Sequence, residues 1–130
     1  MAGEPILIVD DNPANLKLVS FLLSSRGYEV HTAASAAQAL ALLQTLNPRV
    51  ILMDIQLPGM DGLELTRLLK SKASLQNTLI VAVTAFAMKG DEAKALAAGC
   101  DAYVTKPIDT RGLPEYIAKL LSSRSAGKEA

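Results

Sequence analysis

Side chains capable of phosphoryl chemistry stand directly after short, mostly apolar runs at four places in the sequence. Asp54 ends the run V-I-L-M-D and is soon followed by a Pro-Gly turn. The other places are Asp10-Asp11 after residues 6–9, Thr84 after residues 79–83 and Lys106 after residues 102–105. Unbroken apolar runs of this length are typical of strands buried on both faces of a parallel sheet. Because the carboxyl ends of parallel strands face one crevice, these side chains are expected to converge there.

Strands and helices are expected to alternate along the chain. The sequence predicts strands at 6–9, 29–33, 50–54, 79–83 and 102–105, and helices near 13–26, 35–46, 61–70, 92–98 and 113–121. This alternation predicts an α/β fold, with helices on both faces of a parallel sheet and right-handed crossovers. The second strand alternates polar and apolar residues and the fifth is mixed, which favours edge positions for both. The order 2-1-3-4-5 follows, which is that of the flavodoxin-like (βα)5 fold.

Length and composition narrow the class of protein. The chain has 130 residues, half of them hydrophobic, which predicts one domain at 1–121 and a polar C-terminal tail at 122–130 that frays. Thirteen basic and thirteen acidic residues cancel, which argues against a nucleic-acid partner or an anionic membrane surface. No apolar run approaches the roughly 18 residues of a membrane span, and Asp10-Asp11 interrupt the only candidate signal-peptide region. We expect a cytoplasmic protein, in which the single cysteine, Cys100, is a packing residue.

Asp10, Asp11 and Asp54 are expected to form an acidic pocket, since they follow the two strands that border the crevice. Each close pair of carboxylates repels by about 4 kcal/mol at an effective dielectric near 20, so the cluster needs a compensating charge. Lys106 supplies one positive charge and leaves the cluster net negative. A hard divalent cation completes the site most simply, and Mg²⁺ is favoured over zinc because no His or Cys is expected there.

An acid beside Mg²⁺, a lysine and a threonine hydroxyl is suited to receiving a phosphoryl group. Asp54 would be the nucleophile, while the metal, Lys106 and Thr84 hold the phosphoryl oxygens. Taken singly, each residue has a structural alternative: Asp11 or Asn12 could cap the first helix, and Thr84 could satisfy a backbone group. Lys106 could likewise be an ordinary exposed lysine. Their expected convergence at one end of one sheet favours the functional interpretation.

These residues carry a family resemblance: D-D after the first strand, D at the third, T-A after the fourth and K-P after the fifth. From Ile6 to Leu121 the sequence resembles a receiver domain of bacterial two-component response regulators. The segments L-M-D-I-Q-L-P and V-T-A-F-A-M-K-G-D, with no output domain, look most like single-domain regulators of the DivK kind.

The resemblance implies a signalling phosphoacceptor rather than an enzyme, one that supports its own phosphorylation and slow autodephosphorylation. Asp54 would accept phosphate from a sensor histidine kinase or a histidine phosphotransfer protein. Asp10 and Asp11 would bind Mg²⁺ with Asp54 and the main-chain carbonyl of Gln56. Thr84 and Lys106 would contact the phosphoryl group, and Tyr103 would turn inward when Thr84 moves. A downstream protein is then expected to bind the face formed by the fourth helix, fifth strand and fifth helix.

Three other functions are weighed against this one. A phosphatase of the haloacid-dehalogenase type also uses an aspartate nucleophile and Mg²⁺, but it requires D-x-D after the first strand, where this chain has D-D-N. A nucleotide-binding module would need a glycine-rich phosphate loop, and none follows the first strand. A degenerate receiver that serves only as a docking scaffold is the third, and it is the least needed because every site position is filled.

Overall fold

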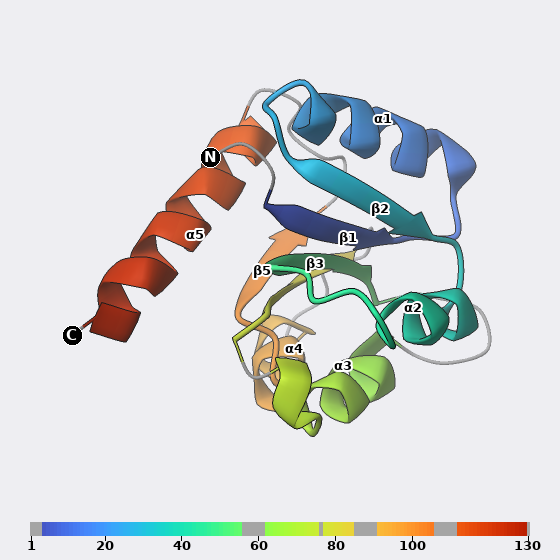
Figure 1. Cartoon of the computed structure of the whole chain (residues 1–130). Helices are drawn as coiled ribbons and strands as arrows, with labels where there is room; N and C mark the ends of the chain where they lie inside the picture. The colour runs from blue at the N-terminus through green and yellow to red at the C-terminus, as the bar shows by residue number, and fades with distance from the viewer. Residues whose placement is uncertain (1–3, 56–61, 76, 85–90, 106–111, 130) are drawn as a thin grey trace.

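The computed structural model describes residues 4–55, 62–75, 77–84, 91–105 and 112–129, and it contains a five-stranded parallel sheet (Figure 1). The strands are β1 (Pro5–Val9), β2 (Glu29–Ala33), β3 (Val50–Asp54), β4 (Leu79–Thr84) and β5 (Ala102–Thr105). Their order is β2-β1-β3-β4-β5, so the predicted flavodoxin-like topology is confirmed. Every residue of β3 and β4 is buried, which explains their unbroken apolar sequences.

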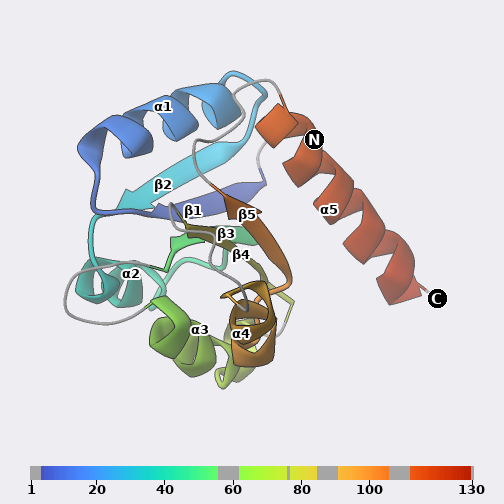
Figure 2. The ribbon, with the colours of Figure 1, turned by 180° about the vertical axis from the view of Figure 1, so that it is seen from behind.

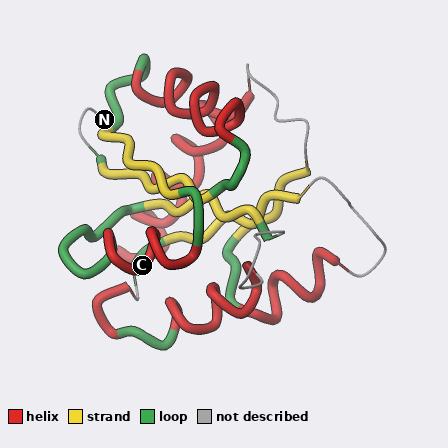
Figure 3. The backbone as a smooth tube through the Cα atoms, turned by 90° about the vertical axis from the view of Figure 1, so that its right-hand side faces the viewer, coloured by secondary structure: helices red, strands yellow, loops and turns green. Residues whose placement is uncertain are grey.

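Helices form a layer on each face of the sheet. They are α1 (Pro13–Ser24), α2 (Ala36–Leu42), α3 (Gly62–Lys70), α4 (Asp91–Ala98) and α5 (Gly112–Glu129), with a short 3₁₀ turn, η1, at Ala73–Leu75. Figures 1 and 2 show α1 and α5 on one side of the sheet and α2, α3 and α4 on the other. In Figure 3 the strands, drawn in yellow, lie as a middle layer between helices drawn in red.

Alternate residues of the central strands belong to two separate hydrophobic cores, one on each face of the sheet. Leu7, Ile51 and Ile80 pack with α2, α3 and α4. Ile6, Leu52 and Val81 pack with α1 and α5. Successive side chains of a strand point to opposite faces, so a strand between two helical layers must be apolar throughout. The sheet is thereby fixed on both faces, and only its ends and loops are left for a site.

Both ends of α1 are formed by residues with a defined capping role. The side chain of Asn12 accepts hydrogen bonds from the main-chain N–H groups of Ala14 (2.9 Å) and Asn15 (3.3 Å), so Asn12 is the N-cap. At the C-terminal end, Gly27 has a φ of 92° and follows the helix in a left-handed conformation. Of the two caps left open by the sequence, Asn12 is the one observed, which leaves the Asp11 carboxylate available for another role.

Two helix ends differ by more than two residues from those predicted. The helix predicted to run to residue 46 ends at Leu42. Tighter turns follow it, in which the N–H groups of Gln44 and Thr45 donate three residues back, to the carbonyls of Ala41 (3.4 Å) and Leu42 (3.2 Å). α5 was expected to end near Leu121, before a polar tail, but the structure continues it to Glu129. Its C-terminal end points away from the sheet in Figures 1 and 2. Helical hydrogen bonds are local, so a helix can continue past the end of its apolar sequence pattern.

None of the helices in these described segments is long and apolar enough to cross a bilayer.

Candidate functional site

Asp54 is the last residue of β3, and its side chain is nearly buried, with a residue exposure of 3%. β3 lies between β1 and β4, which places Asp54 at the middle of the sheet. Asp54 is paired in register with Val83 of β4, and the N–H of Ile55 extends this pairing with a 3.1 Å hydrogen bond to the Val83 carbonyl. The main chain of the acid is therefore held by β4, and the preceding residue, Met53, is also paired with Val9 of β1.

Asp10 follows β1 directly and is also nearly buried, at 4% exposure. Its N–H donates to the Ala33 carbonyl at 3.0 Å. Its Oδ1 accepts from the N–H of Asn12 at 2.9 Å, and its Oδ2 accepts from Nδ2 of Asn15 at 3.4 Å. Asn12 and Asn15 thus orient the Asp10 carboxylate, and sequence reasoning had assigned this role to neither of them.

The carboxylates of Asp10, Asp11 and Asp54 converge. One oxygen from each lies within 4.8 Å of an oxygen of the other two, and Asp11 is exposed whereas the other two are buried. A set of carboxylate oxygens that is open to solvent on one side fits Mg²⁺, which takes few protein ligands and keeps several waters. The donor chemistry therefore suits the metal that the sequence predicted.

A small cavity lies beside the two buried acids. It has a volume of about 10 Å³, roughly the space of one water molecule, and its lining residues include Asp10, Asp54, Leu52, Val83 and Leu113. Apart from the two acids, its walls are apolar and come from the sheet, α1 and α5. One side of the acidic cluster is thus shielded from bulk water, which strengthens electrostatic interactions there.

Thr84 and Tyr103 lie on neighbouring strands and on the same face of the sheet. Thr84 ends β4, is fully buried, and follows the residue paired with Asp54. Tyr103 pairs in register with Ala82, two residues before Thr84, and side chains two apart on a strand share a face. Tyr103 is half-buried against the core beneath α2, α3 and α4, and its hydroxyl oxygen is buried. The two residues are placed so that a movement of one side chain could change the packing of the other.

Gln56 and Lys106, predicted to bind the metal and the phosphoryl group, lie outside the described residues. Their roles remain predictions. His31 lies on the edge strand β2, outside the acidic cluster, and its Nε2 is 2.7 Å from Oε2 of Glu29.

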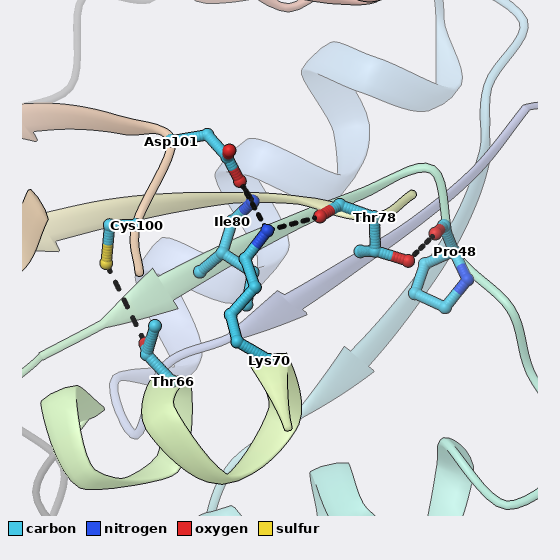
Figure 4. A network of polar contacts seen from close by, with 7 residues as sticks. All are labelled: Pro48, Thr66, Lys70, Thr78, Ile80, Cys100 and Asp101. Carbon is cyan, nitrogen blue, oxygen red and sulfur yellow. Dashed lines mark hydrogen bonds and ion pairs between the residues drawn. The ribbon is translucent and has the colours of Figure 1, made fainter. Parts of the chain in front are cut away.

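A second polar network lies at the amino ends of β4 and β5, away from the acidic cluster (Figure 4). Nζ of Lys70, in the last turn of α3, donates to the Thr78 carbonyl at 3.0 Å and to Oδ2 of Asp101 at 2.9 Å. The same Asp101 oxygen accepts from the N–H of Ile80 at 2.8 Å. This network ties α3 to the two strands, and it has the character of a structural clamp rather than of a reaction site.

Cys100 belongs to the same region. Its thiol lies 3.8 Å from Oγ1 of Thr66 (Figure 4), and burial raises the pKa of the thiol above its usual value. A thiol that stays protonated is a poor nucleophile, in agreement with the predicted packing role.

Comparison with known proteins gives a consistent result. The profile of the response regulator receiver domain matches residues 6–118. The polar-differentiation response regulator DivK of Brucella ovis is 44% identical over 119 residues, covering 92% of this chain and 94% of that protein. DivK of Brucella melitensis biotype 1 is similar to the same extent.

Solved structures with the same fold include a CheY-like response regulator receiver domain protein from Methanospirillum hungatei JF-1. It superposes with a TM-score of 0.89 at 35% identity, covering 99% of this chain and all of that one. The chemotaxis response regulator CheY4 of Vibrio cholerae superposes with a TM-score of 0.84 at 29% identity, covering 92% of this chain and 98% of that one. The BeF3-activated DrrB receiver domain gives a TM-score of 0.84 at 29% identity, covering 94% and 99%.

Proposed function

The chain belongs to the family of response regulator receiver domains and is DivK-like, and from this membership we propose that Asp54 is its phosphate acceptor and Mg²⁺ its cofactor. The observation that carries the proposal is the convergence of Asp10, Asp11 and Asp54, whose carboxylate oxygens lie within 4.8 Å of one another at the carboxyl end of the sheet. A cluster of this kind is costly unless it binds a cation, and family members act as signalling phosphoacceptors.

Asp54 is the best placed of the three acids to be the nucleophile. It ends a central strand, with Asp10 and Asp11 beyond β1 on one side and Thr84 at the end of β4 on the other. Asp10 is already engaged by two hydrogen bonds from the start of α1, and Asp11 is exposed. Asp54 therefore has metal ligands on one flank and a hydroxyl donor on the other.

In the proposed transfer, an oxygen of the Asp54 carboxylate attacks the phosphorus atom of a phosphohistidine. An O–P bond forms at Asp54 while the N–P bond breaks, and the imidazole leaves as the neutral base after taking up a proton. Mg²⁺, held by Asp10, Asp11, Asp54 and the main-chain carbonyl of Gln56, would offset the charge shared by the acid and the phosphoryl oxygens. Asn12 and Asn15 keep the Asp10 carboxylate oriented, and Lys106 would bind a phosphoryl oxygen.

We further propose that Thr84 and Tyr103 convert phosphorylation into a change of surface. The phosphoryl group supplies up to about two negative charges and strong acceptor oxygens, so it can attract the hydroxyl of Thr84. Tyr103 shares its sheet face with Thr84 and packs half-buried against the core on that face, which supports coupling between the two side chains. The surface that would respond is formed by α4, β5 and α5.

Receiver domains of two-component systems interact with histidine kinases or phosphotransfer proteins and with downstream targets. For this chain we propose a cytoplasmic location, a sensor histidine kinase or histidine phosphotransfer protein as phosphate donor, and a protein target at the α4, β5 and α5 surface. Any target that prefers the phosphorylated form must in turn favour phosphorylation, because coupling between two binding equilibria is reciprocal.

The test uses the purified protein with acetyl phosphate, with and without Mg²⁺, and follows protein-bound phosphate by mobility shift. We expect phosphate to be incorporated once per chain, only when Mg²⁺ is present, and to be lost slowly after the donor is removed. A docking scaffold would take up no phosphate. A phosphatase would instead release inorganic phosphate from p-nitrophenyl phosphate with many turnovers, and either result would refute the proposal.

A further inference from the structure

Gly62, the first residue of α3, lies closer to the main chain of the acceptor strand than any other residue type could. A Cβ atom added to Gly62 would stand 2.4 Å from Cα of Ile55 and 2.7 Å from the carbonyl oxygen of Asp54. It would also stand 3.1 Å from the carbonyl carbon of Ile55. All three are main-chain atoms, which cannot rotate away as a side chain can. Gly62 is the first residue of the helix, and the contact requires glycine for its lack of a side chain.

Neither partner in this contact is free to move. On the strand side, Asp54 is paired with Val83, and the N–H of Ile55 donates to the Val83 carbonyl at 3.1 Å. On the helix side, Gly62 itself donates its N–H to the Ile55 carbonyl at 3.3 Å.

The first turn of α3 is also fixed from within the helix. The buried hydroxyl of Thr66 donates to the Gly62 carbonyl at 2.9 Å, and Leu65 and Thr66 are fully buried. An added methyl group at Gly62 must therefore displace either the end of β3 or the start of α3, and the hydrogen bond from Gly62 to the Ile55 carbonyl couples these two segments.

We propose that Gly62 is a positioning residue for phosphoryl transfer, because it lets α3 begin against the Asp54–Ile55 main chain and so fixes the direction of the Asp54 carboxylate. This inference rests on the proposed function and deepens it. Phosphoryl transfer depends on alignment, and a misplacement of about 1 Å can cost on the order of 100-fold in rate. Asp54 must meet both a metal shared with Asp10 and Asp11 and an incoming phosphorus atom, so a shift of its main chain affects binding and transfer together.

Gly99 offers a matched control. It has a φ of +114°, which is strained for a residue with a side chain, and an added Cβ would lie 2.9 Å from Cγ of Lys70. Gly99→Ala should therefore also lower stability. Its position after α4, beside the Lys70 and Asp101 clamp, is at the other end of the sheet from Asp54.

The experiment compares wild type, Gly62→Ala and Gly99→Ala at a temperature where circular dichroism shows each to be folded. Mg²⁺ affinity is measured by calorimetric titration, and the phosphorylation rate by acetyl phosphate titration at saturating Mg²⁺. Gly62→Ala is expected to weaken Mg²⁺ binding and to lower the maximal rate by roughly 10- to 100-fold. Gly99→Ala is expected to retain the wild-type values for both despite its lower stability.

Thr66→Val is the second variant if Gly62→Ala does not fold. It removes the hydrogen bond to the Gly62 carbonyl without adding volume, and a smaller fall in the maximal rate is expected. The inference is overturned if the wild type is phosphorylated and neither α3 variant changes the rate, or if Gly99→Ala changes it equally. A wild type that takes up no phosphate would refute the proposed function itself.

Discussion

Replacing Asp11 with Asn should make the metal-free protein more stable, because the substitution removes one charge from a cluster of three. The carboxylate oxygens of Asp10, Asp11 and Asp54 lie within 4.8 Å of one another. At about that separation two unit charges repel by roughly 3.5 kcal/mol at a dielectric of 20 and by roughly 0.9 kcal/mol in water. Asp11 is exposed and faces two such partners, so we expect a gain of about 1–2 kcal/mol in unfolding free energy.

Asp11 is a better position for this test than Asp10, whose two oxygens accept hydrogen bonds from Asn12 and Asn15. The assay is urea unfolding followed by far-ultraviolet circular dichroism, first with a chelator and then with Mg²⁺. In chelator the Asp11→Asn midpoint should exceed that of the wild type. In Mg²⁺ the wild type should gain more, since a ligand at about 100 times its Kd stabilises by about 2.7 kcal/mol and the variant binds less tightly.

Glu115→Gln is the control for a general charge effect. Glu115 is an exposed acid in the first turn of α5, where a negative charge is favourable to the helix, so its removal should lower stability slightly. If Asp11→Asn lowered stability in chelator, or if Glu115→Gln raised it equally, repulsion within the acidic cluster would not be the dominant effect and the reasoning would be refuted.

Two further predictions concern the polar network at the amino ends of β4 and β5. Lys70→Met should cost about 1–3 kcal/mol of unfolding free energy, because the side chains of Lys70 and Asp101 are only 22% and 24% exposed and Asp101 would lose its cation. Asp101→Asn should lower the unfolding free energy by less, because the Asn side chain can still accept a hydrogen bond from the N–H of Ile80. If the effects of Lys70→Met and Asp101→Asn were additive in a double-mutant cycle, direct coupling between the two side chains would be contradicted. Burial raises the pKa of the Cys100 thiol, so the unfolded state loses this proton first as pH rises. Stability should therefore fall above about pH 8.5, and less steeply in Cys100→Ala; identical slopes would be inconsistent with this.

The strand order could be predicted from the sequence because burial differs between central and edge strands. Two-sided burial makes β3 and β4 apolar up to their last residues, Asp54 and Thr84, whereas β2 exposes Glu29 and Thr32 along one edge. Once the order was fixed, the convergence of the acids after β1 and β3 followed, since the carboxyl ends of neighbouring parallel strands meet. The apolar sequence pattern of the strands and their order in the sheet thus have the same cause, which is the burial of the central strands on both faces.

Other features of the site depend on contacts that the periodic pattern of apolar residues in the sequence does not reveal. Asn15 reaches Asp10 from the first turn of α1, and the pattern of apolar residues in that helix does not reveal this contact. In the sequence, Gly62 looks like an ordinary helix start beside an aspartate. Only the short distance from its Cβ position to Cα of Ile55 shows why a side chain is excluded. The observed length of α5 exceeds the predicted length for a related reason, because helical hydrogen bonds are local and the apolar sequence pattern ends before the helix does.

The identity of the phosphorylated residue tests the central proposal most directly. The protein is incubated with acetyl phosphate and Mg²⁺, the acyl phosphate is reduced with borohydride, and the resulting homoserine is located by peptide mass spectrometry. We predict a single modified residue, Asp54, and no modification in Asp54→Asn. Modification at Asp10 or Asp11 instead, or undiminished labelling of Asp54→Asn, would contradict the proposed phosphoacceptor.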